Sequence, residues 1–308
     1  MATQKRSTGA TTPQTAPAQS RIPVRKTYKL YVGGAFPRSE SGRSYVVSDS
    51  RGRFLANAAQ ASRKDGRDAV VAARKAQPGW AGRTPYNRGQ VLYRAAEVME
   101  DRREQFVEQL RAAEGVGQRK ADTFVDAVID RWVWYAGWAD KVAQVLGGAN
   151  PVAGPYFNLS VPEPTGVVAV VAPAGPLLGL VSVVAPAIAT GNTVVVIASQ
   201  PHPLPAVTLG EVLATSDLPG GVVNILTGSA AEIAPWLASH RDVDALDLTG
   251  VDVDGDAGEL ARDLEAAAAE TLTRVRRPEP GADWLATPGL DRLSWTLETK
   301  TVWHPIGI

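Results

Sequence analysis

Residues that commonly do covalent chemistry are sparse in this chain. None of its 308 residues is a cysteine, which excludes disulfides, thiolate metal sites and a thiol nucleophile. The three histidines, His202, His240 and His304, lie far apart in the sequence without the spacing of metal ligands. His240 stands near Asp242, but neighbouring surface residues at a helix end explain that pair equally well. No G-x-S-x-G elbow and no P-loop is present, so residue types alone indicate no catalytic set.

An acidic run offers a possible metal site. Asp252, Asp254 and Asp256 stand at alternate positions, as they do at the start of a calcium loop. Such a loop needs a glycine at its sixth position and a bidentate glutamate at its twelfth, where this chain has Ala257 and Asp263. The alternative is a solvated acidic helix start, which the helix dipole favours. The mismatch favours the second interpretation, and we expect no metal.

Bulk properties narrow the classes of partner. Lys plus Arg and Asp plus Glu both number 32, so the charge gives no reason to expect a nucleic acid or an anionic membrane as partner. The N-terminus lacks the apolar segment of a targeting signal, and we expect a cytoplasmic protein. Residues 1–26 are rich in Thr, Gln, Pro, Ala and Ser, which predicts a flexible arm or a tail that orders on a partner.

The elements that would position any site are organised around residues 163–199. No residue from Gly166 to Ala198 is charged, and an apolar stretch of this length could cross a bilayer. The glycines and prolines that divide this stretch indicate a different structure. Two β-branched runs, 166–171 and 193–197, flank a turn at 173–176 and a stretch of helix length at 177–190. We therefore predict a buried strand–helix–strand unit in place of a membrane span.

The flanking sequence continues the alternation of strands and helices. We expect a strand at 28–36 that pairs antiparallel with 41–47, and a capping box at Ser62 and Asp65 that opens a helix. A helix over 121–146 carries Trp132, Trp134, Tyr135 and Trp138, whose helical spacing favours packing on two sides over a stacking platform for a ligand. Further strands and helices follow the centre. Together they predict an α/β fold, with a doubly wound Rossmann-like parallel sheet and an N-terminal helical region.

Several spaced motifs resemble the cofactor domain of the aldehyde dehydrogenase superfamily. They are PTGVVAVVAP (164–173), PAIATGNTVVV (186–196) and LPGGVVNILTG (218–228), in the family's order. The resemblance runs from about Lys29 to Arg277. It then skips the domain that holds the family's nucleophilic cysteine and resumes in PGLDRLSWTLETKTVWHPIGI (288–308), which is similar to the family's C-terminal strand.

The resemblance implies four polar or charged groups that this chain replaces. The family's Pro-Trp-Asn turn, whose Asn stabilises the oxyanion, is here Pro-Ala-Gly-Pro around Gly175. The Lys and Glu that hold the adenosine ribose correspond to Ile197 and Gln200, with Ser199 between them. The general-base Glu corresponds by direct count to a proline, and Glu279 is displaced by one residue.

The family's phosphate loop is altered as well. Thr249, Gly250 and Gly255 keep its frame, but Asp252 and Asp254 stand between them. Two carboxylates would face the pyrophosphate, and like charges at close range are unfavourable. The resemblance therefore implies an NAD site that has degenerated at Gly175, Ile197, Ser199, Gln200, Gly250, Gly255 and Glu279. We expect no cofactor, although NAD remains the alternative.

The retained parts predict a role in assembly. In the family, a two-stranded arm extends the catalytic-domain sheet of a neighbouring subunit, and the resemblance places such an arm here. Its residues are Tyr156, Phe157, Leu159, Val161, Trp295, Thr296, Lys300, Val302 and Trp303. We predict a catalytically inactive subunit, or pseudoenzyme, that binds a full-length aldehyde dehydrogenase in a hetero-oligomer. The alternatives are a module that binds NAD(P) and an oxidoreductase that uses no thiol.

The predicted organisation has five parts. A flexible arm (1–26) precedes the N-terminal helical part of the cofactor-type domain (27–150) and a first oligomerisation strand (151–164). A Rossmann-like core (165–282) and a C-terminal oligomerisation strand (283–308) follow.

Overall fold

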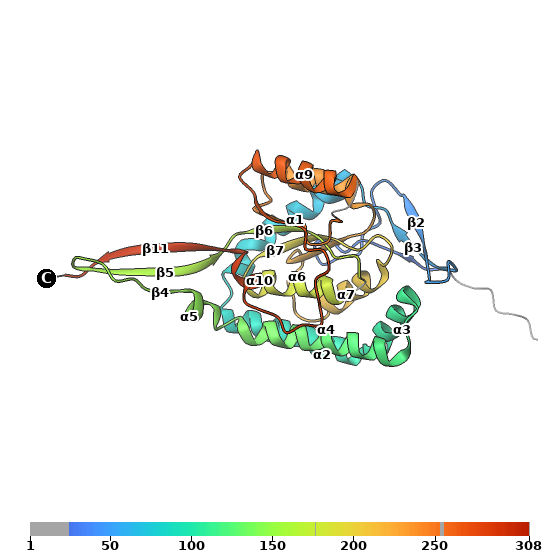
Figure 1. Cartoon of the computed structure of the whole chain (residues 1–308), viewed down its shortest axis with the longest axis horizontal. Coiled ribbons are helices and arrows are strands. Elements are labelled where there is room, and N and C mark those ends of the chain that lie inside the picture. The colour runs from blue at the N-terminus through green and yellow to red at the C-terminus, as the bar shows by residue number, and fades with distance from the viewer. Residues whose placement is uncertain (1–24, 176, 253–255, 308) are drawn as a thin grey trace, which may run out of the picture.

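The computed structural model describes residues 25–175, 177–252 and 256–307. Its centre, which contains β6 and β7 in Figure 1, is a parallel sheet. The sheet has five strands in the order β10-β9-β6-β7-β8. The strands are β6 (Val167–Val171), β7 (Thr193–Ile197), β8 (Val223–Leu226), β9 (Ala245–Asp247) and β10 (Arg274–Arg276). Every residue of β6 and β7 is buried, as expected for central parallel strands covered on both faces.

Helices cover both faces of this sheet, so that alternate strand residues enter two different cores. Val168 and Val170 of β6 join one core with α2 (Pro85–Asp101), α4 (Gln118–Trp138), α6 (Leu178–Ala189) and α7 (Leu204–Ala214), beside which α3 (Arg103–Glu114) packs. Val167 and Ala169 join the other core. Its helices are α1 (Arg63–Ala81), α8 (Ala230–Ala238) and α9 (Asp256–Ala269). The predicted doubly wound α/β fold is confirmed.

The uncharged stretch forms the predicted strand–helix–strand unit, β6–α6–β7. All residues of α6 are buried, because the helix lies between the sheet and α4. Among the described residues, no helix combines the length and apolarity that a membrane crossing requires. The interpretation of this stretch as a buried core unit is therefore correct.

The N-terminal strands pair differently from the prediction. A separate small sheet has the order β1-β3-β2, with β1 (Thr27–Tyr28) parallel and β2 (Ser44–Ser48) antiparallel to β3 (Phe54–Ala59). The predicted strand at 28–36 stops at Tyr28, because the chain then turns to the edge of the main sheet. There the N–H of Tyr31 donates to the carbonyl of Ile225 over 3.0 Å, and Tyr31 is buried.

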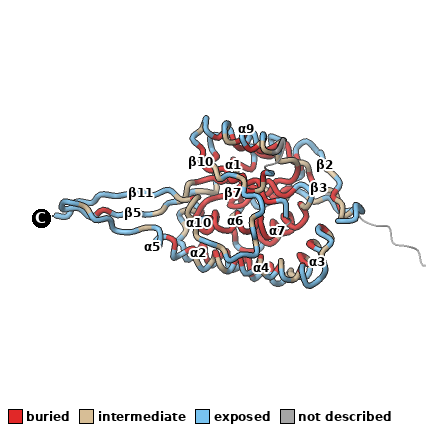
Figure 2. Tube along the Cα trace, in the orientation of Figure 1, coloured by how far each residue is buried: buried red, intermediate tan, exposed pale blue. Residues whose placement is uncertain are grey.

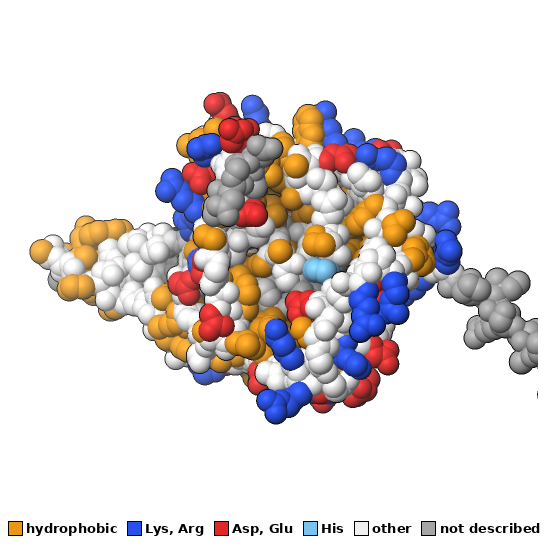
Figure 3. Space-filling model, turned by 45° about the vertical axis from the view of Figure 1, so that its right-hand side comes forward, with side chains coloured by type: hydrophobic (Ala, Val, Ile, Leu, Met, Phe, Trp, Pro, Cys, Tyr) orange, Lys and Arg blue, Asp and Glu red, His pale blue; other side chains and the backbone are white. Residues whose placement is uncertain are grey.

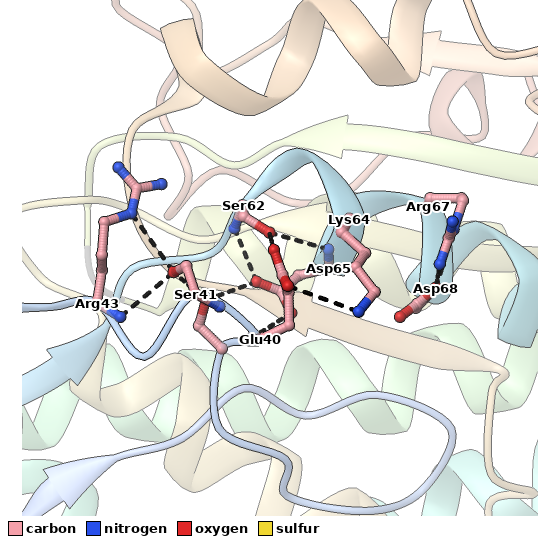
Figure 4. A network of polar contacts seen from close by, with 9 residues as sticks. Glu40, Ser41, Arg43, Ser62, Lys64, Asp65, Arg67 and Asp68 are labelled. Atoms are coloured by element: carbon pink, nitrogen blue, oxygen red, sulfur yellow. Dashed lines mark hydrogen bonds and ion pairs between the residues drawn. The ribbon is translucent and has the colours of Figure 1, made fainter.

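The predicted capping box opens α1, and Figure 4 shows it within a wider polar network. The hydroxyl of Ser62 accepts from the N–H of Asp65 over 3.3 Å, and the Asp65 carboxylate accepts from the N–H of Ser62 over 2.8 Å. Asp65 also accepts from the hydroxyl of Ser39 and the N–H of Glu40. The cap therefore also fixes the loop before β2 against the start of α1.

The aromatic residues of α4 pack in the core. Trp132 and Tyr135 are fully buried, while Trp134 and Trp138 are half-buried against the same core. The predicted long helix is interrupted after Trp138 and resumes as the short α5 (Val142–Leu146). The structure thus supports the packing interpretation over a stacking platform for a ligand.

A β arm projects from one end of the body and is exposed along most of its length (Figures 1 and 2). It consists of β5 (Tyr156–Pro164) and β11 (Leu297–Pro305), paired antiparallel over nine residue pairs, with the two-residue β4 (Gly148–Ala149) beside β5. The short helix α10 (Asp291–Ser294) leads into β11. The flexible arm predicted at 1–26 lies almost wholly outside the described residues.

Asn192 joins the arm to the body. Its side-chain oxygen accepts from the N–H of Gly166 over 2.8 Å, at the start of β6. Its amide nitrogen donates to the hydroxyl of Thr190 over 2.9 Å and to the carbonyl of Thr296 over 3.0 Å, one residue before β11. A single buried amide therefore connects β6, the turn before β7 and the base of the arm.

We expect the substitution Asn192→Ala to lower the free energy of unfolding by about 1–3 kcal/mol, because it leaves buried backbone groups without partners. Urea denaturation followed by circular dichroism measures this effect. Gln90→Ala removes an exposed amide from α2 and is the matched control, with an expected change below about 0.5 kcal/mol. Equal stabilities of the two variants would contradict the assigned role of Asn192.

Candidate functional site

The order of the strands places the ligand crevice of a doubly wound sheet between β6 and β9, outside their carboxyl ends. The loops that follow these two strands touch directly. The N–H of Gly250, after β9, donates to the carbonyl of Val171, at the end of β6, over 3.0 Å. A Cβ atom on Gly250 would lie 2.0 Å from the carbonyl oxygen of Ala172, so this contact requires glycine.

The positions that resemble the family's ribose site carry no free polar side chain in this crevice, apart from one exposed amide. Ile197 ends β7 and is buried in the core that α1 and α8 cover. The hydroxyl of Ser199 is used within the chain, since it donates to the carbonyl of Ala174 over 2.7 Å. Gln200 is exposed, and its backbone carbonyl accepts from the Tyr45 hydroxyl over 3.1 Å.

The remaining degenerate positions are spread over the edge of the crevice. Gly175 is exposed in the turn after β6. Asp252 is exposed, whereas Asp254 and Gly255 lie outside the described residues. Glu279 is held by two arginines: its Oε2 accepts from Nη2 of Arg292 over 2.6 Å and from Nη2 of Arg276 over 3.2 Å. The carboxylate that resembles a displaced general base is therefore the counter-ion of two guanidinium groups.

The chain's own segment 277–296 packs over one side of the crevice. Trp284 lies against the first turn of α6, where a Cβ atom on Gly179 would be 3.2 Å from its ring. Arg131 of α4 holds this segment through its Nη2, which donates to the carbonyls of Trp284 (2.6 Å) and Ala286 (3.2 Å). Arg292 then lies over the Trp284 ring, 4.8 Å from its centroid.

A fully buried carboxylate lies beneath this segment. Asp247, the last residue of β9, accepts from the N–H of Thr249 over 2.8 Å. Its other oxygen lies 3.8 Å from Nη1 of Arg292, and neither atom has a hydrogen-bond partner among the described residues. Burial raises the pKa of Asp247 above its ordinary value, against the opposing effects of Thr249 and Arg292.

The arm presents an apolar face to solvent. Antiparallel pairing places four side chains on one face, because residues opposite one another point to the same side. They are Phe157, Leu159, Val161 and Val302, with exposed fractions of 57%, 44%, 43% and 44%. In the view of Figure 3, hydrophobic side chains of the arm gather toward its outer end. Such a row is unusual for a surface that meets only water.

The other face and the edges of the arm differ from this row. On the opposite face the rings of Tyr156 and Trp303 meet edge to face at 5.7 Å. The outer edge of β11 pairs with no described strand, so a row of backbone N–H and carbonyl groups is open. On the same face as the apolar row, Lys300 lies opposite Val161 and pairs with Glu163 over 3.1 Å, so this ion pair borders the row toward the body.

Two of the expected arm residues lie in the body. Trp295 ends α10 and packs half-buried against the core of α4 and α6. Thr296 is fully buried, and its carbonyl accepts from Thr165 and Asn192. The aromatic-Thr segment therefore anchors the base of the arm, and the strand itself begins only at Leu297.

Comparison with known proteins gives the family of the chain. The profile of the aldehyde dehydrogenase family matches residues 36–275. The chain belongs to the aldehyde dehydrogenase family. It is 32% identical over 253 residues to an aldehyde dehydrogenase of Davidiella tassiana, covering 80% of this chain and 49% of that protein. It is 35% identical over 227 residues to the mitochondrial aldehyde dehydrogenase family 2 member B4 of Arabidopsis thaliana, covering 72% and 42%.

A solved structure of the family has the same fold. The aldehyde dehydrogenase from Brucella melitensis biovar abortus 2308 superposes with a TM-score of 0.75 at 26% identity, covering 80% of this chain and 50% of that one. The present chain thus spans about half the length of the relatives named above, or less.

Within this family member, the buried pair of Asp247 and Arg292 was not foreseen from the sequence. An aspartate inside the apolar run ALDL (245–248) is the signal that could have pointed to it, since a strand interior rarely buries a carboxylate without a partner. The partner could not be identified, because it lies 45 residues further along the chain (292 − 247).

We expect Asp247→Asn to stabilise the chain at pH 7 relative to the native protein. The raised pKa means that the folded state keeps its proton to higher pH than the unfolded state. The native free energy of unfolding therefore falls as pH rises above the ordinary Asp pKa of about 3.9. Urea denaturation of both proteins between pH 3.5 and 7 tests this. The expected difference is near zero at the acid end, and a variant less stable than native at pH 7 would overturn it.

Proposed function

We propose that this chain is a non-catalytic member of the aldehyde dehydrogenase family that acts as a scaffold or regulator of a full-length aldehyde dehydrogenase. The observation that carries the proposal is the packing of segment 277–296, with Trp284 and Arg292, over the crevice at the carboxyl ends of β6 and β9. In the family, the oxidation of an aldehyde proceeds through a thiohemiacetal, which needs a thiol. The 308 residues contain none.

The residues around the crevice also argue against NAD as a resident cofactor. Ile197 offers no donor to a ribose, and the Ser199 hydroxyl is already bonded to Ala174. The loop after β9 carries the exposed carboxylate of Asp252, which opposes a pyrophosphate. Glu279 is bound by two arginines and is not free to take a proton from a substrate.

The arm supports a partner of the same family. Exposure of the apolar row, which consists of Phe157, Leu159, Val161 and Val302, to water is unfavourable, and its burial against a partner would be favourable. The outer edge of β11 offers backbone groups for a further strand. In the family, the matching arm extends the catalytic-domain sheet of a neighbour. The described residues of this chain form no second large sheet that could receive the arm of another copy. A full-length enzyme supplies that sheet, so that the arm adds a strand to it.

Co-expression of the tagged chain with each full-length aldehyde dehydrogenase of its own organism tests this proposal. We expect one of them to co-purify in a fixed ratio, and the double variant Val161→Lys/Val302→Lys to reduce recovery at least about tenfold, since two buried charges cost more than 1.4 kcal/mol. Val71→Lys/Val133→Lys places the same charges on exposed valines of α1 and α4 and is the matched control. A monodisperse chain that ignores every such enzyme would contradict the partner assignment.

The second candidate is a module that still binds NAD(P), which the retained sheet and the Gly250 contact favour. Calorimetric titration with NAD(H) and NADP(H), together with assays on several aldehydes, separates the two functions. We expect no turnover and no binding tighter than about 0.1 mM, or roughly −5.5 kcal/mol. Binding of either cofactor with a smaller Kd than this would support the cofactor module. Turnover by the purified chain alone would refute the non-catalytic role.

A further inference from the structure

A small cavity lies between α4 and the segment that covers the crevice, apart from the arm. It has a volume of about 120 Å³ and is lined from α4 by Arg131 and Tyr135. The segment 279–292 supplies the rest of its wall. At about 30 Å³ for each water molecule, the cavity holds the equivalent of roughly four water-sized groups. The proposed function, which rests on the crevice and the arm, gives this cavity no role.

Arg131 is a buried cation that lacks a counter-ion. Its exposed fraction is 7%, and only its Nη2 is engaged, by the carbonyls of Trp284 and Ala286. No carboxylate of the described residues forms an ion pair with it. Burial lowers its pKa, which is the effect expected for a charge withdrawn from water, and the neighbouring Tyr135 side chain opposes this effect only in part. An unpaired buried charge is costly, and an anion in the cavity would remove that cost.

Tyr135 supplies a second group for such an anion. It is fully buried, and its hydroxyl has no hydrogen-bond partner among the described residues. Burial raises the pKa of Tyr135 to about 12, so the hydroxyl keeps its proton and is available as a donor at neutral pH. A guanidinium beside a hydroxyl donor suits the two oxygens of a carboxylate, which accept from both in one plane.

The other charged groups around the cavity limit the charge of the ligand. Glu279 is paired with Arg276 and Arg292, and Asp291 is paired with Arg276. Asp283 is exposed, and its carboxylate accepts from the N–H of Leu285. These carboxylates would repel a multiply charged anion, so that a single negative charge beside Arg131 is the species that fits.

We propose that this cavity binds a small monocarboxylate, of the size of acetate or propionate, through Arg131 and Tyr135. The inference goes beyond the proposed function and does not depend on it, because it rests on an unpaired buried cation, an unpartnered buried hydroxyl and the volume between them. The carboxylate pairs with the guanidinium of Arg131 and accepts the proton of the Tyr135 hydroxyl in a hydrogen bond.

Calorimetric titration of the full chain with sodium acetate, at constant ionic strength and with sodium chloride as the reference salt, tests this site. We expect saturable binding with a Kd of about 1 mM or tighter. Tyr135→Phe removes one hydrogen bond and should weaken acetate binding roughly five- to tenfold. Arg131→Met removes the cation and should abolish binding. Arg94→Met removes an exposed arginine of α2 and should leave the affinity unchanged.

Three results would overturn the proposal: no saturable heat with acetate, the same heat with chloride, or an unchanged affinity in Tyr135→Phe. If Arg131→Met fails to fold, Tyr135→Phe decides the question alone, with near-ultraviolet circular dichroism confirming its fold. A crystal structure grown in acetate that shows only ordered water in the cavity would assign the unpaired groups to solvent and refute the site.

Discussion

The contact between Arg292 and the open end of the parallel sheet is the constraint on which the other features depend. Arg292 is buried, and it reaches Asp247 at the end of β9, Glu279 before α10 and the ring of Trp284. In an open α/β sheet this end is where a ligand sits. Here a guanidinium from the chain's own segment lies there, so the same interaction closes one side of the crevice, sets the position of α10 and leads β11 out into the arm.

Several parts of the fold were predictable from the sequence because only one structure satisfied the local chemistry. The uncharged run with glycines and prolines at its breaks had to be a buried strand–helix–strand unit, and Ser62 and Asp65 had to cap a helix. Other features depend on long-range contacts. Tyr31 leaves its predicted strand to pair with Ile225, and Thr296 leaves the arm to bond with Asn192, which the local sequence does not specify.

The candidate site shows the same division. The spacing of Ile197, Ser199 and Gln200 after a β-branched run allowed each of them to be placed at the end of β7, and the structure places them there. The groups that cover one side of the crevice have two origins: Trp284 lies in the stretch without a counterpart in the resemblance, and Arg292 lies in the stretch that resembles the family's C-terminal strand. Trp284 and Arg292 have no periodicity that predicts their partners, and those partners lie on α4, α6 and β9. A pairing of charges from distant segments becomes visible only when the chain is folded.

The crevice and the arm differ in whether their exposed groups find partners within the described part of the chain. The segment that covers one side of the crevice is held by contacts within the chain, among them the ion pairs of Arg276 with Glu279 and Asp291. The arm, in contrast, leaves apolar side chains and backbone groups exposed. Its apolar row is exposed to solvent, and the outer edge of β11 pairs with no described strand. Because an exposed apolar sheet edge promotes association with another strand, the arm is the surface on which the proposed hetero-oligomer depends.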